Sequence, residues 1–223
     1  MRLSVIVPVY NEQTTVRQLL TKLVKLSQVK EVVVVDDGST DQTVHEITQV
    51  RSSKIRLFKK QNAGKGSAVR LGLTKVTGDW VLIQDADLEY DPADIPVMIE
   101  PILSGKAKIV FGSRFLGPHL NLLFWHRAGN SLLNFLVNVL FNTTLSDMET
   151  CYKLIPTAVM KQLELNSKGF DLEPEITCKL LRDGYKIFEV PISYTGRDFA
   201  EGKKITWIDG FWAVGVILKE RLG

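Results

Sequence analysis

The chain has 223 residues, of which 45% are apolar and 24% are charged, which is typical of a folded protein and excludes a disordered or collagen-like chain. The 28 basic and 25 acidic residues leave a net charge of only +3, so the composition does not favour nucleic acid as a partner. Two cysteines are too few for a disulfide scaffold and lack the spacing of a zinc site, which indicates a reducing compartment. No secretory leader or stretch of about 20 apolar residues is found, so we expect a cytoplasmic chain without a transmembrane helix.

Short apolar segments alternate with helical patterns in the first half of the chain. The apolar run at 3–9 is typical of a strand buried on both faces, and Val16, Leu19, Leu20 and Leu23 follow it at helical spacing. The same alternation predicts strands at 31–35, 55–58, 79–84 and 108–111, and helices at 43–50, at 64–76 and from Pro92 onward. This order predicts an α/β fold with a mostly parallel central sheet and helices on both faces.

The second half of the chain is more apolar and is predicted to be mainly helical. Residues 121–142 and 206–220 predict two amphipathic helices, the second rich in aromatic residues. A shorter helix is predicted at 172–182, before Gly184, and a strand at 186–190. No internal repeat or low-complexity linker is present, so we expect one domain over residues 1–223.

The segment Asp85-Ala86-Asp87-Leu88-Glu89 follows directly after the predicted strand at 79–84. In an extended backbone, Asp85, Asp87 and Glu89 would point to the same side. Closely spaced carboxylates raise each other's pKa unless a cation lies between them, and oxygen ligands suit Mg²⁺ or Mn²⁺. We therefore expect these three residues to bind a divalent ion. The alternative is a set of helix-capping and solvent-exposed acids.

Two other predicted strand ends carry groups that bind ligands in many proteins. Asp37 lies in an acidic turn after the strand at 31–35, where its carboxylate could accept hydrogen bonds from a guanine or uracil base. Residues 62–68 form a glycine-rich helix start that lacks the spacing of a Walker phosphate loop. Simple turns between strands and helices are the alternative for both. Because ligands bind beyond the carboxyl ends of parallel strands, we expect these turns and the acidic segment to meet at one site.

Several cations follow in the chain that could face an anionic substrate. Arg114 comes after the strand at 108–111, and the loop 194–204 carries Arg197 and Lys203 between glycines. A basic loop with glycines is typical of a lid that closes over an anion, and a solvent-exposed basic loop is the alternative.

Together, four motifs resemble family 2 glycosyltransferases in their order and spacing. They are Val7-Pro8-Val9-Tyr10-Asn11-Glu12, Val35-Asp36-Asp37-Gly38-Ser39, Asn62-x-Gly64-x-Gly66-x-Ala68 and Asp85-Ala86-Asp87. Phe111-Gly112-Ser113-Arg114, residues 169–176 and residues 190–203 are similar to the polyprenol-phosphate glycosyltransferases, a group that includes dolichol-phosphate mannose and glucose synthases. The resemblance spans residues 3–218 and implies the GT-A nucleotide-sugar-binding fold. It departs at Asp147-Met-Glu-Thr-Cys151-Tyr-Lys153, which loosens the assignment to mannose.

The resemblance implies a metal-dependent, inverting hexosyltransferase that uses Mg²⁺ or Mn²⁺. Its donor would be a nucleotide sugar of the GDP-mannose or UDP-glucose type, bound by residues 1–115, and its acceptor a polyprenyl or dolichyl phosphate, bound by residues 116–223. The implied donor-binding residues are Pro8, Tyr10, Glu12, Val35, Asp37, Asp85, Ala86, Asp87, Arg114, Arg197 and Lys203. Asp87, Arg114, Arg197 and Lys203 would also act in catalysis, and Asp147 would position the acceptor.

A polyprenyl phosphate lies in a membrane, so the resemblance also implies a peripheral protein on the cytoplasmic face of a membrane. The helices 121–142 and 206–220 would then lie in the interface, with aromatic anchors at Trp125, Phe135, Trp207, Phe211 and Trp212. Packing of these helices on the catalytic core or on a second subunit is the alternative, and the oligomeric state stays open.

The alternative function is a soluble family 2 glycosyltransferase that acts on a sugar hydroxyl of a polysaccharide or glycan. A hydroxyl acceptor needs a carboxylate base, for which Asp147 is the candidate. A third alternative, a catalytically inactive nucleotide-sugar-binding module, is disfavoured because Asp85, Asp87, Arg197 and Lys203 are all present.

Overall fold

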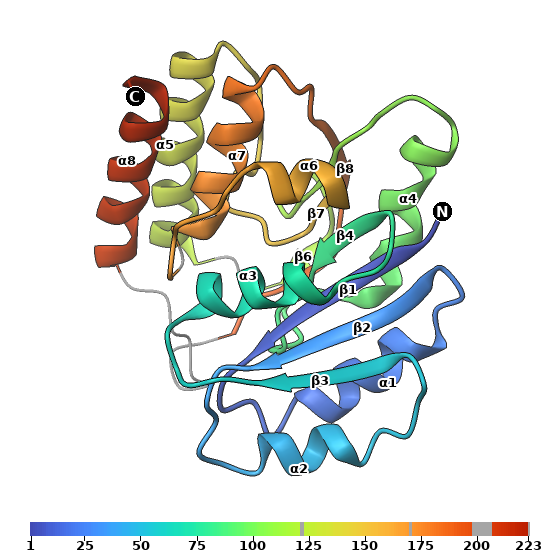
Figure 1. The fold of residues 1–223 in the computed structure, drawn as a ribbon. Helices are drawn as coiled ribbons and strands as arrows, with labels where there is room; N and C mark the ends of the chain where they lie inside the picture. The colour runs from blue at the N-terminus through green and yellow to red at the C-terminus, as the bar shows by residue number, and fades with distance from the viewer. Residues whose placement is uncertain (121–122, 170, 198–206, 223) are drawn as a thin grey trace.

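A computed structural model of the chain describes residues 1–120, 123–169, 171–197 and 207–222, with side chains from residue 210 onward in the last range. Its main strands are β1 (Leu3–Val9), β2 (Val29–Asp36), β3 (Ile55–Lys59), β4 (Trp80–Ile83), β5 (Val110–Ser113), β7 (Lys153–Pro156) and β8 (Phe188–Pro191). These form a seven-stranded sheet of order β3-β2-β1-β4-β7-β5-β8 (Figure 1). Neighbouring strands are parallel except at β7, which is antiparallel to both β4 and β5. The predicted α/β fold with a mostly parallel sheet is confirmed.

Helices cover both faces of this sheet, as predicted. They are α1 (Val16–Lys25), α2 (Thr43–Thr48), α3 (Lys65–Lys75), α4 (Ile95–Leu103), α6 (Thr157–Gln162) and α7 (Leu172–Arg182). Val5 and Val7 of β1 pack in a core with α1 and α4, whereas Ile6 packs in a second core with α3, α6 and α7. Because successive side chains of a strand point to opposite faces, the apolar run of β1 is buried on both sides.

A layer of three helices lies at one end of the molecule, where α5 (Phe124–Phe141) and α8 (Trp207–Leu222) pack beside α7 (Figure 1). Their inner faces meet around Val137, Cys178 and Ile217, which are fully buried. Their outer faces expose large apolar side chains, namely Phe124, Trp125, Leu132, Phe135, Val139, Phe211, Trp212, Leu218 and Leu222. Among the described residues, no helix combines the length and the hydropathy that a membrane span requires. The alternative in which these helices pack on the rest of the chain holds for their inner faces, and contact of their outer faces with a membrane stays a prediction.

Several elements were not predicted from the sequence. β7 and α6 follow one another at 153–162, and a small parallel ribbon pairs β6 (His119–Leu120) with β9 (Tyr194–Thr195). A single bridge between Tyr90 and Tyr194 brings this ribbon next to the acidic segment that follows β4. Strands from both predicted halves, 1–115 and 116–223, take part in the same sheet.

Candidate active site

The three motifs predicted to converge follow β2, β3 and β4, and they do meet beyond the carboxyl ends of these strands. The Asp37 carboxylate accepts hydrogen bonds from the backbone N–H groups of Ala63, at 3.1 Å, and Gly64, at 2.8 Å. Lys65 Nζ, one residue further, lies 2.7 Å from the Asp85 carboxylate. The start of α3 is therefore bound to the turn after β2 on one side and to the acidic segment on the other.

The acidic segment itself differs from the prediction. β4 ends at Ile83, and Leu88 has a left-handed backbone with φ +65°, so Asp85, Asp87 and Glu89 do not line up along one extended strand. The Asp87 Oδ1 atom accepts a hydrogen bond from the Glu89 N–H at 3.1 Å, which closes a turn. Among the described residues, no cluster of three or more acidic, histidine or cysteine side chains is arranged to hold a metal ion. The three carboxylates therefore do not share one side of an extended strand as expected, whereas the binding of a divalent ion by Asp85, Asp87 and Glu89 stays a prediction.

Each carboxylate of this segment instead has its own partner. Asp85 pairs with Lys65, and Glu89 accepts hydrogen bonds from the Tyr194 hydroxyl, at 2.8 Å, and from the Arg197 N–H, at 2.9 Å. Asp87 faces the Arg197 guanidinium at 3.1 Å. Burial, together with the nearby charges of Asp85 and Glu89, raises the pKa of Asp87 to about 7, although Arg197 opposes the shift. Negative charge is thus in excess around Asp87.

This donor set fits a hard divalent cation. All side-chain donors are oxygens, and an added positive charge would relieve the repulsion around Asp87. Mg²⁺ is usually held by one or two carboxylates together with substrate phosphates, so a closed cage of three protein ligands is not required. Asp87 fits this role best, because both oxygens of Asp85 contact Lys65 Nζ and both oxygens of Glu89 bond to Tyr194 and Arg197.

The residues predicted to hold the base have more structural contacts than expected. Asp37 is buried, and besides the two backbone N–H groups it forms an ion pair with Lys60. Val35 is fully buried in the core beneath α3, so only its backbone borders the strand end, and Ala86 is buried as well. Pro8 is half-buried near the end of β1, and Tyr10, which follows this strand, is exposed.

Arg114 and Asp147 form a buried pair that the sequence did not reveal. Arg114 Nε and Nη2 lie 2.8 and 2.7 Å from the two oxygens of Asp147, and the Arg114 backbone N–H donates to the same carboxylate. Asp147 is completely buried, and α5 holds its segment in place through Asn134, which bonds to the backbone of Ser146 and Met148. Both oxygens of Asp147 bind Arg114, so any effect of Asp147 on the acceptor would act through Arg114, and its role in positioning the acceptor stays a prediction.

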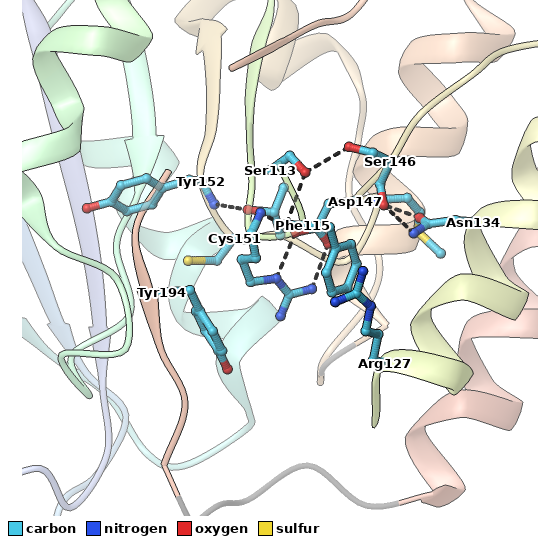
Figure 2. Close-up of polar contacts among 12 residues, drawn as sticks. Ser113, Phe115, Arg127, Asn134, Ser146, Asp147, Cys151, Tyr152 and Tyr194 are labelled. Carbon is cyan, nitrogen blue, oxygen red and sulfur yellow. Dashed lines mark hydrogen bonds and ion pairs between the residues drawn. The ribbon is translucent and has the colours of Figure 1, made fainter. Parts of the chain in front are cut away.

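Figure 2 shows the surroundings of this pair, with Phe115, Arg127 and Tyr194 labelled among the residues drawn around it. The Arg114 Cζ atom is 5.5 Å from the centroid of the Phe115 ring and 5.3 Å from that of Tyr194. The Arg127 Cζ atom also lies 5.5 Å from the Phe115 ring. Arg127 is exposed in the first turn of α5 and forms no ion pair with any described residue. Tyr194, whose hydroxyl bonds to Glu89, joins this cluster to the acidic segment.

Arg127 was not predicted as a site residue, although the sequence carries a signal. It is the only Asp, Glu, Lys or Arg in the range 121–142, which is otherwise apolar or neutral. A lone cation in such a helix has no partner of opposite charge on its own element. Its place near the start of the helix brings it to the Phe115 ring, which Arg114 also contacts, and only the fold shows this shared neighbour.

A second buried charge cluster lies behind Lys65. Lys65 Nζ contacts Glu173 at 2.8 Å as well as Asp85, which ties the start of α7 to the acidic segment. Burial and the neighbouring Glu173 raise the pKa of Glu149 to about 8. Burial lowers the pKa of Lys153 to about 8, against the effect of Glu173 and Glu149. The structure therefore joins both predicted halves of the chain by ion pairs just below the site.

Two predicted residues fall outside this description. Lys203 lies outside the described residues, and so does the side chain of Trp207.

Comparisons with known proteins agree with this architecture. The model of the family "Glycosyl transferase family 2" matches residues 4–163. Dolichol-phosphate mannosyltransferase of Pyrococcus furiosus is 32% identical over 213 residues, which cover 91% of this chain and 59% of that protein. The low-salt glycan biosynthesis hexosyltransferase Agl6 of Haloferax volcanii is 28% identical over 223 residues, covering 97% of this chain and 53% of Agl6. The chain thus spans little more than half the length of each relative.

Solved structures show the same fold. Glucosyl-3-phosphoglycerate synthase from Mycobacterium tuberculosis, crystallised with Mn²⁺, uridine diphosphate and phosphoglyceric acid, superposes with a TM-score of 0.77 at 20% identity. The match covers 99% of this chain and 78% of the synthase. The same enzyme in complex with Mg²⁺ and uridine diphosphate gives a TM-score of 0.73.

Proposed function

Because the chain belongs to glycosyl transferase family 2, we propose that it is a metal-dependent, inverting hexosyltransferase that moves a sugar from a nucleoside diphosphate to a polyprenyl phosphate. The relative from Pyrococcus furiosus is named for transfer to dolichol phosphate, which supports this acceptor class. The observation that carries the proposal is the group formed by Arg114, Phe115 and Arg127 at the start of α5.

This group has the features that a lipid phosphate requires. Two guanidinium groups contact the Phe115 ring, and one of them, Arg127, is exposed and able to bind a phosphate oxygen. Phe124 and Trp125, in the same turn of α5, are 72% and 81% exposed and present apolar surface beside the cation. A phosphate head with an apolar chain matches both features, whereas a soluble sugar matches neither the charge nor the apolar surface.

The acidic segment would receive the donor. We propose that Asp87, with Asp85, holds Mg²⁺ or Mn²⁺ against the donor diphosphate, and that Pro8, Tyr10, Glu12, Val35, Asp37 and Ala86 border the nucleotide. In this assignment Val35 and Ala86 act through their backbone, since their side chains are buried. Arg197 lies among the carboxylates, where it can also contact phosphate. For Lys203, the proposed contact with the diphosphate is supported by the sequence motif alone.

The proposed reaction is a single displacement at the anomeric carbon. A phosphate oxygen of the acceptor forms the new bond to this carbon while the bond to the nucleoside diphosphate breaks with its electron pair, which inverts the configuration. An acceptor phosphate with a second pKa near ~6 is largely ionised at neutral pH, so no side chain needs to remove a proton. When bound, the divalent ion would offset the charge that develops on the leaving diphosphate. Arg114 and Arg127 would orient the attacking phosphate.

The exposed apolar faces of α5 and α8 support a membrane surface as partner. They expose Trp125, which lies two residues before Arg127, together with Phe135, Phe211 and Trp212, and aromatic side chains favour the membrane interface. Both cysteines are buried and free, which agrees with a reducing compartment and hence with the cytoplasmic face.

Transfer to a sugar hydroxyl is less well supported. A hydroxyl acceptor needs a base, and both oxygens of Asp147, the residue predicted for this task, are bonded to Arg114. No observation favours this alternative, but the test below includes it.

The test is a panel of donors and acceptors with the purified full chain in mixed detergent micelles. GDP-mannose, UDP-glucose and UDP-N-acetylglucosamine are each offered with a short polyprenyl phosphate or a soluble oligosaccharide, with Mn²⁺ or with EDTA. We expect a polyprenyl-phosphate sugar of inverted configuration from one donor, abolished by EDTA and by Asp87→Ala. Transfer to the oligosaccharide alone, or release of no nucleoside diphosphate from any donor, would contradict the proposal. Arg2→Gln, at the opposite edge of the sheet, serves as the matched control.

A further inference from the structure

We propose that Arg197 is a built-in cation of the donor site: it occupies the acidic residues in the absence of substrate and is displaced when a divalent ion and a nucleoside diphosphate enter together. The inference rests on the proposed function, because it concerns the state of the same site before the donor binds.

The guanidinium of Arg197 contacts three carboxylates at once. Nη2 lies 3.1 Å from Asp87, Nη1 lies 3.5 Å from Glu12, and Nε lies 3.8 Å from Glu89. Glu12 follows β1, whereas Asp87 and Glu89 follow β4, so the side chain joins the turns after two neighbouring strands. One guanidinium thus lies among three carboxylates at the place where the proposed metal would bind.

These contacts are weak compared with those of Arg114. Arg114 makes two parallel bonds of 2.7 and 2.8 Å to a fully buried carboxylate. Arg197 makes a single, longer contact with each carboxylate, and its buried Nε has no hydrogen-bond partner among the described residues. The Arg197 backbone is nevertheless fixed, because its N–H donates to Glu89 at 2.9 Å. The side chain can therefore leave the carboxylates while the residue stays beside the site.

The charges predict how the two ligands depend on one another. A divalent ion alone must compete with a cation that is already in place. A nucleoside diphosphate alone meets the three carboxylates and is repelled. When both enter together, the ion takes over the carboxylates and the released guanidinium faces the phosphates, where it attracts the donor. Removal of the Arg197 charge should consequently affect the two ligands in opposite directions.

The experiment measures Mn²⁺ binding to the full chain without nucleotide, by the electron paramagnetic resonance signal of free Mn²⁺. We expect Arg197→Gln to bind Mn²⁺ about tenfold more tightly than the wild type, and Arg197→Lys, which keeps the charge, to bind it like the wild type. With Mn²⁺ saturating, we expect Arg197→Gln to bind UDP or GDP about tenfold more weakly in calorimetry. Arg2→Gln removes a distant, exposed arginine and should leave both affinities unchanged.

A second measurement needs no variant. In the wild type, saturating UDP or GDP should lower the dissociation constant of Mn²⁺ by about tenfold. Equal Mn²⁺ affinity with and without nucleotide overturns the inference, and so does an Arg197→Gln protein that binds nucleotide-free Mn²⁺ no better than the wild type. If no nucleoside diphosphate binds to either protein under any condition, the proposed function fails instead. The comparison of nucleotide-free Mn²⁺ affinities then still decides whether Arg197 competes with the ion.

Discussion

Gly66 packs so closely on the backbone of Ser167 that a Cβ atom at position 66 would lie 2.2 Å from the Ser167 carbonyl oxygen. The Gly66 N–H donates to the next carbonyl, that of Lys168, at 2.8 Å. The glycine of the predicted glycine-rich motif is thus explained by contact between α3 and the segment that leads into α7. It does not require a bound phosphate.

We expect Gly66→Ala to destabilise the protein by about 3 kcal/mol, because a backbone carbonyl cannot move away as a flexible side chain can. Urea unfolding measures the change. Gly129 offers the matched control, since it lies within α5 and a Cβ there would meet nothing within 4 Å. Gly129→Ala should stabilise the protein by about 0.5–1 kcal/mol through helix propensity. Equal stability of Gly66→Ala and the wild type would show that the segment at 167–168 relaxes freely.

The buried pair of Arg114 and Asp147 gives a second prediction. Asp147→Asn leaves the guanidinium without its counter-charge, so we expect a loss of about 3–5 kcal/mol in the free energy of unfolding. The double variant Arg114→Met/Asp147→Leu removes both charges and should be more stable than Asp147→Asn. Urea unfolding of Arg114→Met, Asp147→Leu and the double variant completes a double-mutant cycle with the wild type. Additive effects would show that the pair is not coupled.

This pairing also changes how the activity of Asp147→Asn is read. From the sequence, a large loss of turnover would have indicated a base for a hydroxyl acceptor. In the structure the same substitution releases Arg114, which is proposed to orient the acceptor phosphate, so turnover falls for either acceptor. The acceptor panel is therefore the discriminating experiment.

The central sheet was predictable because its strands are continuous apolar runs between turns. β7 was not, because its first residue is Lys153, and a charged residue argues against a buried strand. In the fold the Lys153 ammonium bonds to the carbonyl of Met148 at 2.9 Å and lies 5.0 Å from the ring centroid of Phe111. These partners make the buried lysine tolerable, and none of them can be read from local sequence.

The place of the site was predictable for a similar reason, since ligand-binding turns of a parallel sheet meet at one edge. The partners of its side chains were not. Arg114 and Asp147 are 33 residues apart, and Arg197 is 110 residues from Asp87. Local pattern gives the residue type and the strand end, whereas only the fold decides which of two cations meets which carboxylate.

Glu31 gives a prediction about acid stability. Its carboxylate is buried and accepts hydrogen bonds from the Ser4 hydroxyl at 2.6 Å, from the Thr77 N–H at 2.6 Å and from Arg56 Nη1 at 2.7 Å. Burial alone would raise the pKa of Glu31, but these bonds lower it to about 2. An unfolded glutamate has a pKa near ~4.3. The stabilisation is therefore complete above that value and is lost as the pH falls toward 2.

We expect Glu31→Gln to lower the free energy of unfolding at pH 7 by about 1–3 kcal/mol. The variant should also lose less stability than the wild type between pH 5 and about 2–3, because it no longer carries this titrating group. Urea unfolding across this pH range measures both effects. Glu100→Gln, an exposed position at the surface of α4, should follow the wild type. An unchanged pH dependence in Glu31→Gln would show that other acids dominate acid unfolding.

The exposed turn at the start of α5 predicts vesicle binding. Replacing Phe124 and Trp125 together by serine removes two large apolar side chains that pack on little else, so the fold should keep its stability. We expect the double variant to float with polyprenyl-phosphate vesicles at least about tenfold less than the wild type. Leu103→Ser, 69% exposed at the end of α4, is the matched control and should bind like the wild type. Wild-type protein that stays wholly in the soluble fraction would exclude this membrane contact.

Arg127 gives the most direct test of the acceptor site. Its guanidinium is exposed, forms no ion pair with any described residue, and lies over the same Phe115 ring that Arg114 contacts. We expect Arg127→Gln to raise the KM for polyprenyl phosphate by about tenfold or more, because it loses a charge-assisted bond to phosphate. The Kd for the nucleotide with Mn²⁺ should stay unchanged, since Arg127 does not contact the acidic segment.

Two variants serve as controls for this change. Arg127→Lys keeps the charge but loses the planar geometry that lets a guanidinium donate two bonds to one phosphate. Its KM for polyprenyl phosphate should lie between those of Arg127→Gln and the wild type. Arg51→Gln removes an exposed arginine that precedes β3, at the opposite edge of the sheet, and should not alter the KM. If Arg127→Gln weakened nucleotide binding and left the acceptor KM unchanged, the guanidinium would belong to the donor site. The lipid phosphate would then have to bind elsewhere.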